Sequence, residues 1–210
     1  MPDGRDFPAR ILLRAAAAGV PIQAALASKL GAYLQLLQRW NRTVNLTGFS
    51  LEPASDAAID RLILEPIAAA SYLEPTDRCV VDVGSGGGSP ALPMKLACPE
   101  VEFVLVESKT RKAAFLREVI RALELEQTHV ENHRLEELDA AARYREWANI
   151  VTLRAVRIEP KVLSEIDGLL SQSGRIFFFG NAAAGEANVP GRTIGTVALP
   201  GCAFLGIAKR

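Results

Sequence analysis

The sequence has few cysteines and few aromatic residues. Its three cysteines, Cys79, Cys98 and Cys202, lie far apart and form no C-x-x-C pair. An odd number at such spacing argues against a disulfide framework and against a zinc site, and it favours a reducing compartment. Aromatic residues make up only 6% of the chain, which disfavours a large base-stacking platform for nucleic acid.

The sequence also lacks an excess of one charge and any long hydrophobic run. Lys and Arg number 24 and Asp and Glu number 24, which disfavours unspecific coating of DNA but allows a local basic patch. No stretch approaches the roughly 18 uninterrupted apolar residues of a membrane helix. Acidic and basic side chains interrupt residues 1–20, unlike an export signal. We therefore expect a cytoplasmic monomer without membrane contact or bound metal.

The N-terminal third of the chain has a helical pattern. Within residues 21–40, apolar side chains recur at three- and four-residue steps, and Pro21 is predicted to lie in the first turn of this helix. Residues 54–73 predict a further helical stretch that Pro66 should kink or split. We expect residues 1–75 to form a helical cap.

The pattern changes at residue 78, where short apolar runs begin to alternate with helical segments. The predicted strands cover residues 79–84, 101–107, 128–132, 149–156 and 174–180, and the predicted helices between them include residues 110–125 and 160–170. Two more strand-like pieces, 193–199 and 203–209, are predicted to form a closing hairpin. Such alternation predicts an α/β core over residues 76–210, with a mostly parallel sheet covered on both faces and one antiparallel strand near the C-terminus.

A glycine-rich turn is the strongest chemical signal. Residues 80–90, VVDVGSGGGSP, predict a buried strand that runs into this turn, with Pro90 opening the next helix. Glycines let the backbone approach a ligand closely and leave its amides exposed. In an open α/β sheet the ligand lies beyond the carboxyl ends of the strands. The turn is therefore a predicted cofactor-binding loop.

Two cofactor classes fit such a loop. Dinucleotide folds favour G-x-G-x-x-G, in which Gly84 and Gly86 match but Ser89 replaces the third glycine. S-adenosylmethionine (SAM) methyltransferases favour D-x-G-x-G, which Asp82 completes. Its carboxylate can orient the ammonium group of SAM but would repel a pyrophosphate. SAM is thus favoured, and an NAD(P)-dependent oxidoreductase stays as the less favoured alternative.

Two residues at predicted strand ends add to this site. Glu107 ends the second strand, where a carboxylate can accept hydrogen bonds from both ribose hydroxyls of either cofactor. Arg154 lies inside the apolar run VTLRAV, and a buried arginine requires a partner. Glu107 therefore supports adenosine binding without choosing the class.

Five strings resemble one family, in register from about residue 25 to 180. DVGSGGGSPALP followed by VESKTRKAAFLREV resembles the bacterial 16S rRNA guanine-N7 methyltransferases of the RsmG/GidB family. WNRTVNLTG at 40–48, HRLEEL at 133–138 and TLRAV at 152–156 are similar to further family strings. The resemblance implies a SAM-dependent methyltransferase fold, SAM as cofactor and 16S rRNA of the small ribosomal subunit as partner.

The resemblance also implies which residues bind the cofactor. Gly84 and Ser89 would hold the methionine end, and Leu135 and Glu136 would frame the adenine. Arg154 would line the same pocket. The expected cofactor-binding set is Asp82, Gly84, Ser85, Gly86, Ser89, Glu107, Leu135, Glu136 and Arg154.

The expected RNA-facing residues are Asn45, Arg111 and Lys112. Asn45 lies in the loop that the resemblance places beside the cofactor, where it would hold the target base or, alternatively, cap its own turn. Arg111 and Lys112 would contact phosphates or, alternatively, form a solvated helix face. Guanine N7 carries a free lone pair, so no catalytic base is required and proximity is the expected source of catalysis.

The chain departs from the family pattern at five positions. Leu62, Glu65 and Phe179 stand where the family usually has His, Asp and Lys. Cys202 and Ala203 stand where the family usually has a polar pair such as Arg-His. These departures leave open a SAM-binding relative with altered or lost rRNA activity.

Overall fold

The computed structural model describes residues 6–139, 142–155, 159–181, 192–200 and 203–209. The helices are α1 (Phe7–Ala18), α2 (Ala24–Asn41), α3 (Asp56–Ile59), a π-helical turn (Asp60–Leu64), α4 (Glu65–Ala70), α5 (Ala91–Ala97), α6 (Thr110–Ala122), α7 (Leu135–Asp139), a 3₁₀ turn (Ala142–Tyr144) and α8 (Pro160–Leu169). The strands are β1 (Cys79–Val83), β2 (Glu102–Val106), β3 (Thr128–Glu131), β4 (Ala148–Arg154), β5 (Leu170–Asn181), β6 (Thr193–Leu199) and β7 (Ala203–Lys209).

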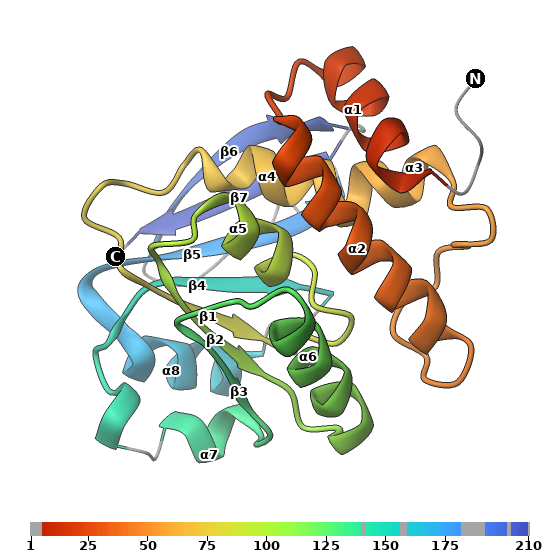
Figure 1. Cartoon of the computed structure of the whole chain (residues 1–210). Helices are drawn as coiled ribbons and strands as arrows, with labels where there is room; N and C mark the ends of the chain where they lie inside the picture. Colours follow the sequence, from red (N-terminus) through yellow and green to blue (C-terminus); the bar gives the residue numbers. More distant parts are fainter. Residues whose placement is uncertain (1–5, 140–141, 156–158, 182–191, 201–202, 210) are drawn as a thin grey trace.

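The strands form one sheet in the order β3-β2-β1-β4-β5-β7-β6 (Figure 1). The first five strands pair in parallel, whereas β7 is antiparallel to both β5 and β6. The predicted α/β class, the mostly parallel sheet, the single antiparallel strand and the closing hairpin are confirmed. The strand order reverses between β1 and β4, and open α/β sheets bind ligands beyond the carboxyl ends of the strands at such a point.

Successive residues of the central strands face opposite sides of the sheet. Val80 and Phe103 pack on the side of α5, α6 and the N-terminal helices, whereas Val81 and Val104 pack on the side of α7 and α8. Figure 1 shows these two layers of helices with the sheet between them. Because both faces are covered, the strands read as continuous apolar runs. None of the described helices combines the length and apolarity needed to cross a bilayer.

The N-terminal helices start and stop at clear local signals. The Asp6 carboxylate caps α1 by accepting a hydrogen bond from Ala9 N at 3.1 Å, and Gly19 ends the helix in the left-handed conformation. The prediction that Pro21 lies in the first turn of the second helix is wrong, because α2 begins at Ala24 after the extended Gln23. Residues 19–23 are used instead for the turn between the two helices.

The predicted helix over residues 54–73 is split, as Pro66 suggested. A π-helical turn separates α3 from α4, and in it Glu65 N donates to Asp60 O rather than to Arg61 O. Pro66 has no N–H and cannot donate to Leu62 O. Two consecutive carbonyl groups, those of Arg61 and Leu62, thus lose their α-helical donors and are open to other partners.

Candidate functional site

The glycine loop follows β1 at the carboxyl edge of the sheet, where the strand order reverses. Gly84, Gly86 and Gly88 have φ angles of 75°, 51° and 84°, in the left-handed region where other residues are strained. The amides of Gly84 and Ser85 both donate to Val106 O, at 2.9 and 3.0 Å, which ties the loop to the end of β2. Ser85 is buried, and its hydroxyl donates to the Asp82 backbone carbonyl at 3.0 Å.

The carboxylate of Glu107 holds the loop from the neighbouring strand end. Its Oε2 accepts from Gly86 N at 2.9 Å, and its Oε1 accepts from Lys109 N at 2.7 Å. Each carboxylate oxygen has a further lone pair that can accept a hydroxyl proton. Glu107 is therefore placed as predicted, fixed by the backbone and still able to bind a diol.

A cavity of about 280 Å³ opens beside Glu107. Its lining residues are Val83, Gly84, Val106, Glu107, Ser108, His133, Arg134, Leu135 and Glu136. Ligand pockets are usually larger, roughly 300–1,000 Å³, so this cavity suits one part of a cofactor such as its adenosine. Four predicted cofactor residues, Gly84, Glu107, Leu135 and Glu136, are thus brought together from three separate segments.

Asp82 and Arg154 form a second polar group at the ends of β1 and β4. The Asp82 side chain is buried, and its Oδ1 accepts from Thr152 Oγ1 at 2.5 Å. Burial raises the pKa of Asp82, while Thr152, Ser85 and Arg154 oppose that shift. Within the described chain, Asp82 Oδ2 and Arg154 Nε are buried without a hydrogen-bond partner. An unused acceptor and an unused donor suit the ammonium and carboxylate of an amino acid.

Arg154 connects the glycine loop to the interrupted helix, which is the run of α3, the π-helical turn and α4 over residues 56–70. Its Nη1 donates to Arg61 O at 2.5 Å and to Ser89 Oγ at 3.0 Å. The Ser89 hydroxyl in turn donates to Leu62 O at 2.9 Å. The two carbonyl groups released by the π-helical turn and Pro66 are therefore the acceptors that receive Arg154 and Ser89.

Glu65, which the sequence marks as a departure from the family pattern, completes this cluster. Its Oε2 accepts from Arg154 Nη2 at 3.0 Å and from Arg61 Nη1 at 2.8 Å. Burial raises the pKa of Glu65 to about 7 against the opposing effect of both arginines, and burial lowers the pKa of Arg154 to about 10. The Phe179 ring covers the Arg154 guanidinium at 4.6 Å. In the sequence, Glu65 is marked by its place beside Pro66 and by its standing where the family usually has Asp.

The loop after α2 rests directly on the glycine loop. The Tyr33 hydroxyl donates to Gly87 O at 2.6 Å, and a Cβ atom on Gly87 would lie 2.9 Å from Leu46 O. Asn41, which the sequence analysis did not single out, organises this loop by accepting from the amides of Leu46 and Thr47 at 2.9 and 3.0 Å. The N-terminal helices therefore support the candidate cofactor loop.

The predicted RNA-facing residues lie on two separate elements, the loop after α2 and the first turn of α6. Asn45 is exposed, and its side chain makes no hydrogen bond to any described residue, so turn capping falls to Asn41. Arg111 and Lys112 lie in the first turn of α6, where Arg111 is exposed and Lys112 partly buried. Trp40 Nε1 of α2 donates to Glu118 of α6 at 3.1 Å, which joins the two helices.

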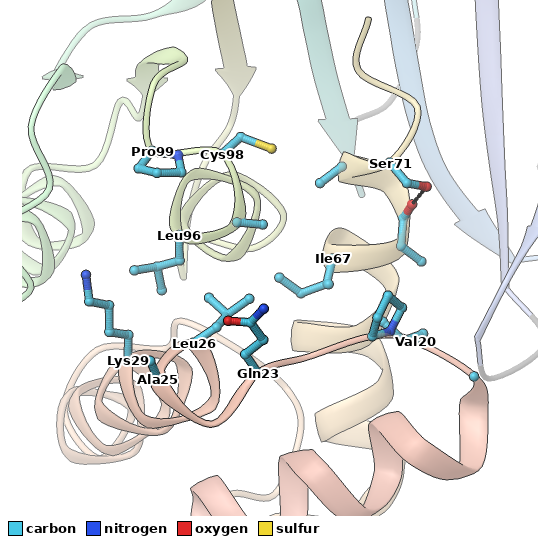
Figure 2. Close-up of a pocket in the computed structure, with 15 residues that line it drawn as sticks. Val20, Gln23, Ala25, Leu26, Lys29, Ile67, Ser71, Leu96, Cys98 and Pro99 are labelled. Carbon is cyan, nitrogen blue, oxygen red and sulfur yellow. Dashed lines mark hydrogen bonds between the residues drawn. The ribbon is translucent and has the colours of Figure 1, made fainter. Parts of the chain in front are cut away.

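A larger cavity, of about 710 Å³, lies away from the glycine loop. Figure 2 shows Leu26, Ile67 and Leu96 pointing into it from α2, α4 and α5. The carboxyl ends of α4 and α5, which line it, lead into the amino ends of β1 and β2. Ligands of open α/β sheets bind at the opposite edge. Cavity size alone would thus have pointed away from the glycine loop.

Comparison with known proteins identifies the family to which this chain belongs. A family model for GidB, rRNA small subunit methyltransferase G, matches residues 26–192. Ribosomal RNA small subunit methyltransferase G of Dichelobacter nodosus is 38% identical over 68% of this chain and 64% of the relative. The protein of the same name from Stenotrophomonas maltophilia is 40% identical over 60% of this chain and 58% of the relative. The matches thus span less than two thirds of these relatives.

A solved structure extends the fold comparison. It is a SAM dependent methyltransferase from Aquifex aeolicus, with a TM-score of 0.55 and 12% identity over 70% of this chain and 90% of that chain. At such low identity the likeness concerns the fold alone. It agrees with the predicted methyltransferase type of α/β fold.

Proposed function

Because this chain belongs to the GidB family of rRNA small subunit methyltransferases, we propose that it is a SAM-dependent enzyme that methylates N7 of a guanine in 16S rRNA. The observation that carries the proposal is the glycine loop, with Asp82 before it and Glu107 bound to its Gly86 amide. This arrangement offers an acidic, backbone-lined cradle at the carboxyl edge of the sheet. An acidic cradle suits a cationic sulfonium cofactor better than a pyrophosphate.

The donors and acceptors of this site fit SAM. Glu107 would hold the ribose, and the cavity lined by Leu135 and Glu136 would take the adenine. Asp82 Oδ2 and Arg154 Nε, both buried without partners among the described residues, would meet the amino-acid end. The space above Gly86 supports this placement, because a Cβ atom there would meet only Gly84 O, at 3.7 Å.

Methyl transfer to guanine N7 requires of the protein mainly that it bind and align the two reactants. SAM, when bound, supplies an electrophilic methyl group. Guanine N7 carries no proton, so the chain needs no general base, and its residues bind and align the reactants. The loop around Asn45 would receive the base beside the glycine loop, and Arg111 and Lys112 would contact phosphates without reading sequence.

The proposed small-subunit substrate also suggests a cellular location for the protein and separate roles for its N-terminal and C-terminal regions. We propose a cytoplasmic location, since bacterial small ribosomal subunits are assembled there. Residues 1–75 would act as a helical cap that presents the RNA-facing loop, and residues 76–210 would hold the cofactor. The contacts of Tyr33 and Leu46 with Gly87 support this division.

Two experiments test the proposal. Calorimetric titration of the pure protein with SAM and with NAD should give binding to SAM alone, and binding to NAD alone would favour an oxidoreductase. Mass spectrometry of 16S rRNA from a strain lacking the gene should show one guanine without its N7 methyl group. A protein that binds SAM while the deletion strain keeps every methylation would be the relative with altered activity that Leu62 and Phe179 left open.

A further inference from the structure

Arg154 is a buried cation whose two Nη groups are already bonded within the protein. Its side chain is 10% exposed, its Nη atoms bond Arg61 O, Ser89 Oγ and Glu65 Oε2, and Phe179 covers one face of the guanidinium. Little of this group is left to reach an RNA. Its contacts join three segments that are distant in sequence: the end of β4, the interrupted helix and the end of the glycine loop.

We propose that Glu65 is a positioning residue, whose carboxylate fixes Arg154 across the interrupted helix and so holds Ser89 and the glycine loop in the geometry needed for methyl transfer. The inference rests on the proposed function. Glu65 touches neither candidate substrate nor candidate cofactor, and it acts through Arg154. The interrupted helix makes this possible, because an unbroken helix would have used the carbonyl groups of Arg61 and Leu62 internally.

The charges around Glu65 explain why Arg154 depends on it. Arg61 and Arg154 both point at Glu65 Oε2, so without the carboxylate two guanidinium groups would face each other. Asp60 cannot replace it, because its carboxylate pairs with Arg14 of α1 at 2.6 Å. Removing one partner of a buried ion pair leaves an uncompensated charge, which the structure can relieve by moving Arg154.

The groups that face Arg154 from other elements do not replace Glu65 either. Asp82 of β1 uses Oδ1 for Thr152, and no hydrogen bond joins its carboxylate to Arg154 among the described contacts. Tyr33 of α2 donates its hydroxyl proton to Gly87 O. Burial raises the pKa of Glu65 to about 7, so the carboxylate that holds Arg154 forms as pH rises through neutrality. The ion pair that holds Arg154 in position should therefore be lost as the pH falls below about 7.

The first test needs no catalysis. The exchange of Arg154 Nε–H with water can be followed by ¹⁵N NMR in the full chain without cofactor, with the signal identified by its absence in Arg154→Lys. At about pH 8, Glu65→Gln should lower the protection of this proton by about tenfold or more, and Glu65→Asp should restore part of it. Glu74→Gln is the matched control, since Glu74 pairs with Arg175 at the opposite edge of the sheet.

Equal protection in the wild type and Glu65→Gln would overturn the inference, whether or not the protein methylates RNA. If Glu65→Gln does not fold, the comparison rests on Glu65→Asp and on wild-type protection below neutrality, and unchanged protection in both would have the same meaning.

The second test is the pH profile of methyl transfer to small subunits from the deletion strain. Wild-type kcat should rise through about pH 7, while Glu65→Gln should lose this rise and about tenfold in kcat. SAM affinity should fall as well, because Arg154 is proposed to meet the amino-acid end of the cofactor, so kcat is measured at saturating SAM. A wild-type profile in Glu65→Gln refutes the positioning role. No methylation by the wild type would instead refute the proposed function, and the exchange measurement would still decide the role of Glu65.

Discussion

Tyr33→Phe removes a single hydroxyl group that links the N-terminal helices to the glycine loop. Tyr33 is fully buried, and its hydroxyl donates to Gly87 O at 2.6 Å. Phenylalanine has the same ring, so the substitution leaves packing almost unchanged and isolates the hydrogen bond. Burial raises the pKa of Tyr33, so the hydroxyl stays protonated and the bond persists across the accessible pH range.

The expected cost follows from leaving a buried carbonyl without its donor. Such a loss costs about 1–3 kcal/mol, so the free energy of unfolding should fall by about that amount. The loop would then be held less firmly before the cofactor binds. If SAM needs the present loop geometry, up to about 1–2 kcal/mol of the loss should appear as weaker SAM binding, about 5- to 30-fold in Kd.

Urea denaturation and calorimetric titration with SAM measure the two quantities separately. Tyr72→Phe is the matched control, because Tyr72 is 37% exposed and lies in the turn after α4. It should change neither quantity. If Tyr33→Phe unfolds at the same urea concentration and binds SAM as the wild type does, the proposed support of the cofactor loop by the N-terminal helices is refuted.

Three further predictions concern the candidate cofactor and RNA residues. Gly86→Asp should abolish SAM binding in calorimetry, because a side chain and a charge would enter the ligand space at a φ of 51°; a normal isotherm would exclude this pocket. Glu107→Ala should weaken SAM binding by about 1–3 kcal/mol, since a charged acceptor is lost, and an unchanged Kd would contradict its role. Arg111→Ala with Lys112→Ala should leave SAM binding nearly intact and give weaker small-subunit RNA binding with a shallower salt dependence. An unchanged salt slope would mean a solvated helix face, and lost SAM binding would place both residues in the cofactor pocket.

The sequence by itself determined the architecture of the core and the place of its loop. Continuous apolar runs between helical segments identified the strands, because a strand buried on both faces has no polar side. Asp82, Gly84 and Gly86 identified the loop, because its backbone conformation and the proposed ligand contact favour those residue types locally. Family strings added Leu135 and Glu136, which periodicity alone would have left as an exposed helix start.

The tertiary structure decided how the loop is supported. Pro66 announced a break in the helix, but only the fold brings the freed carbonyl groups of Arg61 and Leu62 against Ser89 and Arg154. Likewise, the local pattern could not show whether Asn41 or Asn45 caps the turn, since both residues suit a polar turn. The folded loop decides it, because the amides of Leu46 and Thr47 point at the Asn41 side chain. These contacts join residues up to 93 positions apart. Local propensity acts over a few residues, so only chain closure through the sheet could decide them.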